Sequence, residues 1–224
     1  MDRHFRGDSM NKNKPFSESA QPEITGHKPS RTDGTLMTNA GSDMFSTALQ
    51  ELGAVLARVD EAGIDTACET LARAQKIVVY GCGREALQLK GFAMRLYHLG
   101  LEVSVVGDMN TPPLRPADVF LVSSGPGETT TVLTLMQVAR QAGATVLLLT
   151  AEAGSSAVAL ADFTLLIPAQ TMARDQGPQK TSLLPMGSVF EGALFLLFEV
   201  MVLKLKALTG QSSEAMRTRH TNME

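Results

Sequence analysis

The chain has 224 residues, of which 44% are hydrophobic and 19% are charged, and its formal net charge is −3. This length predicts one globular domain, although two small domains would also fit. The slight negative charge and the lack of any run of Lys or Arg argue against nucleic acid or an anionic membrane as a partner.

The first 40 residues are polar and mix acidic with basic side chains, and they contain no apolar core of a signal peptide. We therefore expect a disordered leader over residues 1–40 and a single domain with a C-terminal tail over 41–224. Between residues 43 and 74 the apolar positions recur every three or four residues, which predicts a helix pair broken near Gly63. The two cysteines, Cys68 and Cys82, show neither zinc nor disulfide spacing, which favours a reducing, cytoplasmic setting.

Short runs rich in β-branched residues follow, and each is almost continuously apolar, as in strands covered on both faces. They are "KIVVYG" (76–81), "EVSVVG" (102–107), "VFLVSSG" (119–125), "TVLLLTA" (145–151) and "FTLLIPA" (163–169). Helical patterns separate most of them, at 84–100, 127–143 and, more briefly, 155–162. This alternation predicts an α/β fold with a parallel, doubly wound sheet.

Two other segments stand out. The connection at 108–118 holds three prolines, which exclude a regular helix, so we expect a loop that lines a site. The apolar stretch at 187–208 includes Glu191, Glu199, Lys204 and Lys206, too many charges for a membrane span, and it is typical of a buried helix in a soluble protein.

In parallel sheets of this kind, ligands bind beyond the carboxyl ends of the strands. This rule selects "GCGRE" (81–85), "DMNTP" (108–112), "SSGPGETT" (123–130) and "TAEAGSS" (150–156). The first and third carry glycines, and the third adds four hydroxyl groups near the start of a helix, a composition suited to holding an anion. The alternative is that these glycines only form turns, and for an isolated loop the two interpretations are about equal.

Five segments together carry a family resemblance: "VVYGCGREALQLKGFAMRLYHLG", "VVGDMNTPP", "SSGPGETTTV", "LLPMGSVFEGALFL" and "MRTRHTNME". In this order they resemble the sugar isomerase (SIS) domain family, and within it the 6-phospho-3-hexuloisomerases. The resemblance implies a five-stranded parallel sheet in a three-layer αβα sandwich of flavodoxin-like type, a homotetramer, and no metal or cofactor. It implies conversion of 3-hexulose 6-phosphate into fructose 6-phosphate in the ribulose monophosphate pathway, an intramolecular oxidoreduction of the aldose-ketose type.

Two positions depart from the family pattern. The family's first loop reads Gly-x-Gly-Arg-Ser and its third reads Ser-Gly-Ser-Gly-Glu-Thr, and these serines hold the phosphate. Here Glu85 and Pro126 replace them. A carboxylate opposes a nearby phosphate, and proline offers neither a hydroxyl nor an N–H. The predicted substrate-binding residues are Gly83, Arg84, Glu85, Thr111, Ser123, Ser124, Gly125, Gly127 and Thr129.

The predicted catalytic residues are Glu191 and His220. An enediol reaction needs a base to remove a carbon-bound proton, and the resemblance assigns that role to Glu191. Without the resemblance, an acidic side chain that complements the helix dipole is the simpler interpretation of Glu191. His220 lies in a polar tail where histidine is usually a surface residue, and the resemblance implies that the tail reaches a neighbouring subunit.

We therefore expect a cytoplasmic sugar isomerase. Two alternatives stay open: a non-catalytic sugar-phosphate-binding module, and an isomerase of a different sugar.

Overall fold

The computed structural model describes residues 36–223, which form a five-stranded sheet with every strand parallel to its neighbours. The strands are β1 (Ile77–Gly81), β2 (Val103–Val105), β3 (Val119–Ser123), β4 (Thr145–Thr150) and β5 (Phe163–Leu166), in the spatial order β2-β1-β3-β4-β5. All five lie within the ranges predicted from sequence, so the predicted α/β fold with a five-stranded parallel sheet is confirmed.

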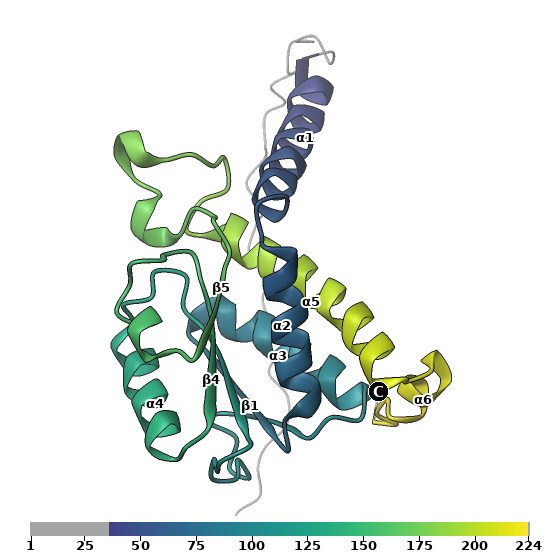
Figure 1. Ribbon diagram of the computed structural model, residues 1–224. Helices are drawn as coiled ribbons and strands as arrows, with labels where there is room; N and C mark the ends of the chain where they lie inside the picture. The colour runs from purple at the N-terminus through teal and green to yellow at the C-terminus, as the bar shows by residue number, and fades with distance from the viewer. Residues whose placement is uncertain (1–35, 224) are drawn as a thin grey trace, which may run out of the picture.

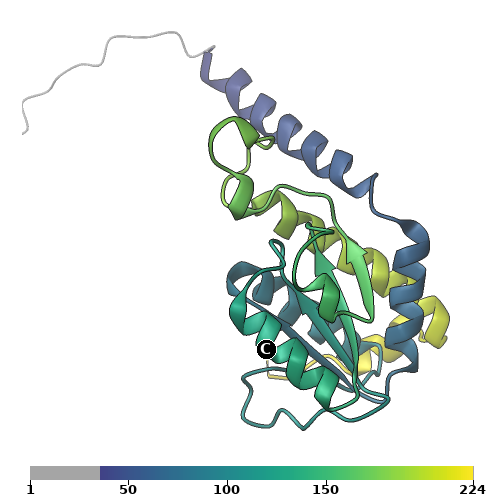
Figure 2. The ribbon, with the colours of Figure 1, turned by 60° about the vertical axis from the view of Figure 1, so that its left-hand side comes forward.

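Helices cover both faces of the sheet (Figure 1). The helices are α1 (Leu36–Leu56), α2 (Glu61–Arg73), α3 (Gly83–His98), α4 (Thr130–Gln141), α5 (Ser188–Thr209) and α6 (Ser213–Thr218). One face carries α2, α3 and α5, while α4 and the short 3-10 helix η1 (Val158–Leu160) cover the other. α1 projects from the body of the domain (Figure 2).

The strands have two buried faces because their side chains alternate between the two helical layers. In β1, Ile77 and Val79 join the core under α2, α3 and α5, whereas Val78 joins the core under α4. In β4, Leu147 and Leu149 do the same, with Val146 and Leu148 on the opposite face. Continuous apolar runs follow from this arrangement, since neither face of the strand meets water.

The predicted break of the N-terminal helix pair near Gly63 is wrong, because the chain turns at residues 57–60. The Asp60 carboxylate caps α2 by accepting the N–H groups of Ala62 and Gly63, at 3.2 and 3.1 Å. Gly63 is buried inside α2, where an added Cβ would lie 3.0 Å from Leu165 Cδ1 of β5. Because Gly63 has no side chain, α2 can pack closely against β5 at this position.

Other local differences are small. The stretch at 155–162 forms only the single turn η1, and α6 was not predicted. The loop at 108–118 contains no helix, as its prolines require. Residues 1–35 of the predicted leader lie outside the described residues, and α1 begins at Leu36, before the predicted boundary at residue 40.

Candidate active site at the carboxyl ends of the strands

A cavity of about 490 Å³ opens beyond the carboxyl ends of β1 and β3. Four segments far apart in sequence line it: the start of α3, the loop between β3 and α4, residues 171–173, and the start of α5. The lining residues are Cys82, Gly83, Arg84, Glu85, Pro126, Thr129, Thr171, Met172, Ala173, Met186, Gly187, Phe190 and Glu191. The cavity therefore lies where doubly wound sheets bind their ligands.

Arg84 and Glu191 form an ion pair across this cavity. The Arg84 guanidinium also donates to Ser188 Oγ at 2.7 Å, and the hydrogen bond with Glu191 raises the pKa of Arg84 above its ordinary value. The Glu191 side chain is only 15% exposed, whereas that of Arg84 is 54% exposed. A mostly buried carboxylate with one fixed cationic partner is thus directed into the cavity from the first turn of α5.

Glu85 lies in the same cavity, and its carboxylate binds the loop between β3 and α4. Its two oxygens accept the N–H of Gly125 at 3.0 and 3.2 Å, and one of them also accepts the Ser123 hydroxyl. Burial raises the pKa of Glu85, the two hydrogen bonds lower it, and the nearby charge of Glu191 raises it further, with a net increase. Two carboxylates and one guanidinium therefore share the cavity.

The remaining polar groups of this loop are largely bonded within it. Ser124 is buried, and its hydroxyl accepts the N–H of Gly127 at 3.1 Å and lies 3.3 Å from the Thr129 hydroxyl. Gly127 has a φ of +67°, and an added Cβ would lie 2.0 Å from Ser155 Oγ, so this position requires glycine. Pro126 and Thr129 line the cavity. Of the predicted anion-binding groups in the loop, Ser123, Ser124 and the Gly125 amide are already occupied within the protein.

Residues 171–173 were not predicted to belong to the site. Thr171 is 2% exposed, and its hydroxyl is buried without a hydrogen-bond partner although the residue lines the cavity. A buried hydroxyl without a partner costs free energy unless a ligand satisfies it. The segment follows β5, so the rule of carboxyl strand ends, applied to the fifth strand as well, would have identified it.

Two predicted site residues lie away from the cavity. The Thr111 hydroxyl donates to the carbonyls of Val105 and Asp108, at 2.6 and 2.8 Å, and so stabilises the turn after β2. The His220 ring stacks on His98, the last residue of α3, at 5.3 Å between ring centroids. Because Arg84 lies at the opposite end of α3, the rise of an α-helix separates the two regions by about 20 Å. One chain does not bring His220 to Glu191, and Figure 1 shows α6 at the far end of α5.

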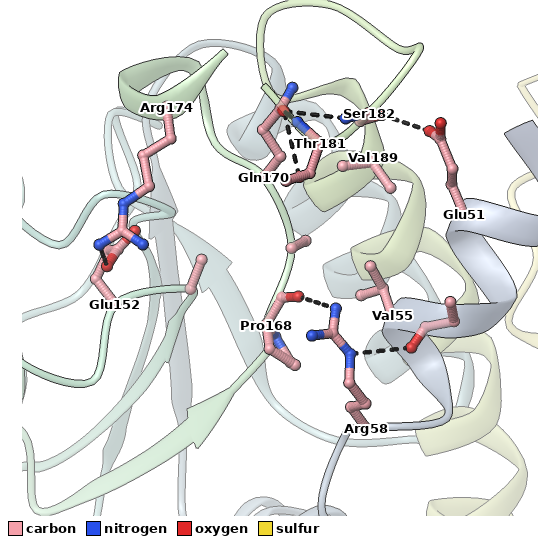
Figure 3. A pocket seen from close by; sticks show the side chains of 13 residues that line it. Glu51, Val55, Arg58, Glu152, Pro168, Gln170, Arg174, Thr181, Ser182 and Val189 are labelled. Atoms are coloured by element: carbon pink, nitrogen blue, oxygen red, sulfur yellow. Dashed lines mark hydrogen bonds and ion pairs between the residues drawn. The ribbon is translucent and has the colours of Figure 1, made fainter. Parts of the chain in front are cut away.

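A second cavity, of about 450 Å³, lies between α1 and the carboxyl ends of β4 and β5 (Figure 3). Its four charged residues are each bonded within the protein. Arg174 pairs with Glu152, Arg58 donates to the Pro168 carbonyl at 2.6 Å, and Glu51 accepts the Leu183 N–H at 2.8 Å and the Ser182 hydroxyl. The segment at 150–156 therefore contributes Glu152 to this cavity, and the first cavity is the stronger candidate for chemistry.

No three His, Cys, Asp or Glu side chains among residues 36–223 are grouped so that they could hold a metal ion. Within the same residues, every helix is too short or too polar to cross a membrane.

The chain is similar to known proteins in sequence and in fold. A family model described as SIS domain matches residues 70–191. The 3-hexulose-6-phosphate isomerase of Bacillus subtilis (strain 168) is 35% identical over 183 residues, 82% of this chain and 98% of the relative. A protein of that name from Mycobacterium gastri is also 35% identical, over 80% of this chain and 89% of the relative. A solved Methanococcus jannaschii structure, from which a 3-hexulose-6-phosphate isomerase function was inferred, superposes with a TM-score of 0.69 at 26% identity, covering 83% of this chain and 99% of that one.

Proposed function

Because the chain belongs to the SIS domain family, we propose that it is a sugar-phosphate isomerase that interconverts 3-hexulose 6-phosphate and fructose 6-phosphate. The observation that carries the proposal is the carboxylate of Glu191, which reaches the cavity beside an anion-binding loop and is held in position by Arg84. The SIS domain model spans both residues, and the relatives with this printed name cover about four fifths of the chain.

The reaction moves a ketone from carbon 3 to the adjacent carbon 2. A base removes the proton on carbon 2, which lies beside the carbonyl, and an enediol forms across carbons 2 and 3. The proton returns to carbon 3 and a hydroxyl proton passes from one oxygen to the other, so carbon 2 is oxidised and carbon 3 is reduced. The reaction is therefore an intramolecular oxidoreduction between two ketoses, and it uses the same enediol chemistry as an aldose-ketose isomerisation.

In this scheme Glu191 is the base, because it is the mostly buried carboxylate whose position is fixed by a cation. The guanidinium of Arg84 stabilises the negative charge that develops on the substrate oxygens, as a fixed donor does in a partly dehydrated site. The phosphate is held by the start of α4 and its preceding loop, where Thr129 lines the cavity. Thr171 supplies a further hydroxyl to the substrate, since its side chain has no partner within the protein.

The proposed assembly is a homotetramer. Large apolar side chains are exposed on α1, α3 and α5, and a single chain leaves this surface in water. They are Met44, Phe45, Leu49, Leu87, Met94, Tyr97, Phe195, Leu196, Val200, Leu203 and Leu208. Because His220 lies far from Glu191 within one chain, its catalytic role requires the tail of one subunit to reach the cavity of another. The protein would act in the cytoplasm, in the ribulose monophosphate pathway.

A second candidate is a sugar-phosphate-binding module without catalysis. One observation favours it: the carboxylate of Glu85 already binds the Gly125 N–H and the Ser123 hydroxyl of the loop. Exchange of the substrate's carbon-bound proton with solvent deuterium, followed by NMR, distinguishes the two functions. The isomerase exchanges the proton beside the ketone of fructose 6-phosphate, whereas a binding module leaves it in place. Proton exchange on the unphosphorylated sugar in the same assay tests the remaining alternative, an isomerase of a different sugar.

A further inference from the structure

The cavity carries more negative than positive charge before any ligand binds. Arg84 is the cationic residue among the lining residues, and Glu85 and Glu191 are the two acidic ones. Arg84 is bound by Glu191. A phosphate dianion that enters this cavity therefore meets two negative groups and a guanidinium that is already paired.

Glu85 occupies the position that an anionic ligand of this loop would take. Its carboxylate receives the Gly125 N–H and the Ser123 hydroxyl, close to the start of the twelve-residue helix α4. Backbone N–H groups and the positive end of a helix dipole are the features that bind phosphate oxygens in proteins. The approach is tight, since a Cβ added to Gly125 would lie 3.2 Å from Glu85 Oε1. A phosphate cannot use the same two donors while the ionised carboxylate remains on them.

We propose that Glu85 is an internal anion whose position on the β3–α4 loop is taken by the phosphate of the substrate, and that a phosphorylated ligand binds with uptake of one proton at Glu85. A neutral carboxylic acid removes the repulsion, and its O–H becomes a donor to a phosphate oxygen. The inference rests on the proposed function for the presence of a phosphate on the substrate, whereas the loop's affinity for an anion is shown by its contacts with Glu85.

The surroundings of Glu85 favour this proton uptake. Partial burial raises the pKa of the carboxyl group, and the proximity of Glu191 adds to the increase. The other charged or titratable groups around it are Arg84 and Cys82 at the start of α3. The loop itself contributes Glu128, which is exposed and accepts the Ser156 N–H. An incoming dianion would raise the pKa of Glu85 further, because like charges disfavour the ionised form.

Calorimetric titration with sulfate tests the proposal near neutral pH, where sulfate is a dianion that does not itself titrate. Measurements in two buffers of different ionisation enthalpy give the number of protons taken up on binding. We expect about one proton for the wild type and none for Glu85→Gln. Above the pKa of Glu85, the affinity of the wild type falls about tenfold per pH unit, while that of Glu85→Gln stays level. Glu69→Gln removes an exposed carboxylate from α2 and is the matched control for net charge.

Equal proton uptake by the wild type and Glu85→Gln would overturn the proposal, as would binding without proton uptake or binding to neither protein. Glu85→Ser is the second variant, in case the amide perturbs the loop, and thermal melting confirms that each protein is folded. Sulfate binding does not depend on catalysis. If proton uptake is found but no substrate proton exchanges with solvent, this inference stands and the isomerase proposal fails.

Discussion

The guanidinium of Arg84 and the carboxylate of Glu191, 107 positions apart in sequence, form an ion pair that joins the first turns of α3 and α5 across the cavity. Arg84 also donates to Ser188 Oγ on the same turn of α5. The pair holds the proposed base in one orientation and places a cation beside it. The site therefore depends on the relative position of two helices, and disturbance of either helix start affects both residues.

Replacement of Glu191 by Gln tests the proposed base. The amide keeps the size of the side chain but cannot accept a proton, so exchange of the substrate proton should fall by about 10²- to 10⁴-fold. Affinity for fructose 6-phosphate should change little, because the phosphate is held elsewhere. Glu199→Gln, which removes an exposed partner of Arg95 farther along α5, should leave exchange unchanged. Equal exchange by wild type and Glu191→Gln would exclude Glu191 as the base.

Replacement of Thr171 by Val tests whether the unpartnered hydroxyl serves a ligand. Removal of a buried polar group without a partner should raise the free energy of unfolding by about 1 kcal/mol and weaken sugar-phosphate binding. Thr150→Val is the matched control, because the buried Thr150 hydroxyl donates to the Gly125 carbonyl and accepts the Glu152 N–H. That variant should lose about 1–3 kcal/mol in urea denaturation. If Thr171→Val is destabilised as much as Thr150→Val, its hydroxyl has a structural role.

The two cysteines should differ in reactivity. Cys68 is fully buried, and burial raises the pKa of its thiol to about 12, so the native protein should protect it from iodoacetamide. Cys82 lines the cavity and should be alkylated first. Fructose 6-phosphate should slow the labelling of Cys82, as followed by mass spectrometry of peptides. Labelling of Cys82 at the same rate with and without ligand would place the sugar phosphate outside this cavity.

The stability of the protein should depend on pH through Glu85. Its pKa in the folded protein is raised above the ordinary value of 4.5. The folded state therefore binds the proton more tightly than the unfolded state does, and stability falls as pH rises from about 4.5 through the folded pKa. Glu85→Gln removes this dependence. As pH increases, the urea midpoint of the wild type should fall relative to that of Glu85→Gln. A rise of the wild-type midpoint relative to that of Glu85→Gln would contradict the raised pKa.

The assembly prediction has two parts. Light scattering should give a mass near four times the 23.9 kDa of one chain, because the proposed association removes the exposed apolar side chains of α1, α3 and α5 from water. A monomer at micromolar concentration would refute it. Mixing Glu191→Gln with His220→Asn, each inactive alone, should restore part of the activity, because some sites then combine an intact Glu191 with an intact His220 from another subunit. Absence of any recovery after subunit exchange would exclude a shared site.

Sequence alone determined the architecture of this protein. The five apolar, β-branched runs became the five parallel strands, because residues buried on both faces of a sheet must be apolar whatever their neighbours are. The same local reasoning located Arg84, Glu85 and the β3–α4 loop at the carboxyl edge of the sheet, since that edge follows from strand direction alone. Glu191 was predicted to be the base only through the family motif. A lone acidic residue at a helix start is explained more simply by the helix dipole.

Only the tertiary structure decided what those residues contact. The carboxylate of Glu85 binds donors 38 and 40 positions away. The Thr171 hydroxyl is buried without a partner where the segment after β5 packs against the start of α5. Gly63 was expected to break a helix, yet it serves a contact with Leu165 of β5. His220 was expected to reach the cavity of a neighbouring subunit, and within its own chain it lies about 20 Å from the cavity, beside His98 at the opposite end of α3. Such pairings depend on distances between segments remote in sequence, and local residue patterns contain no measure of those distances.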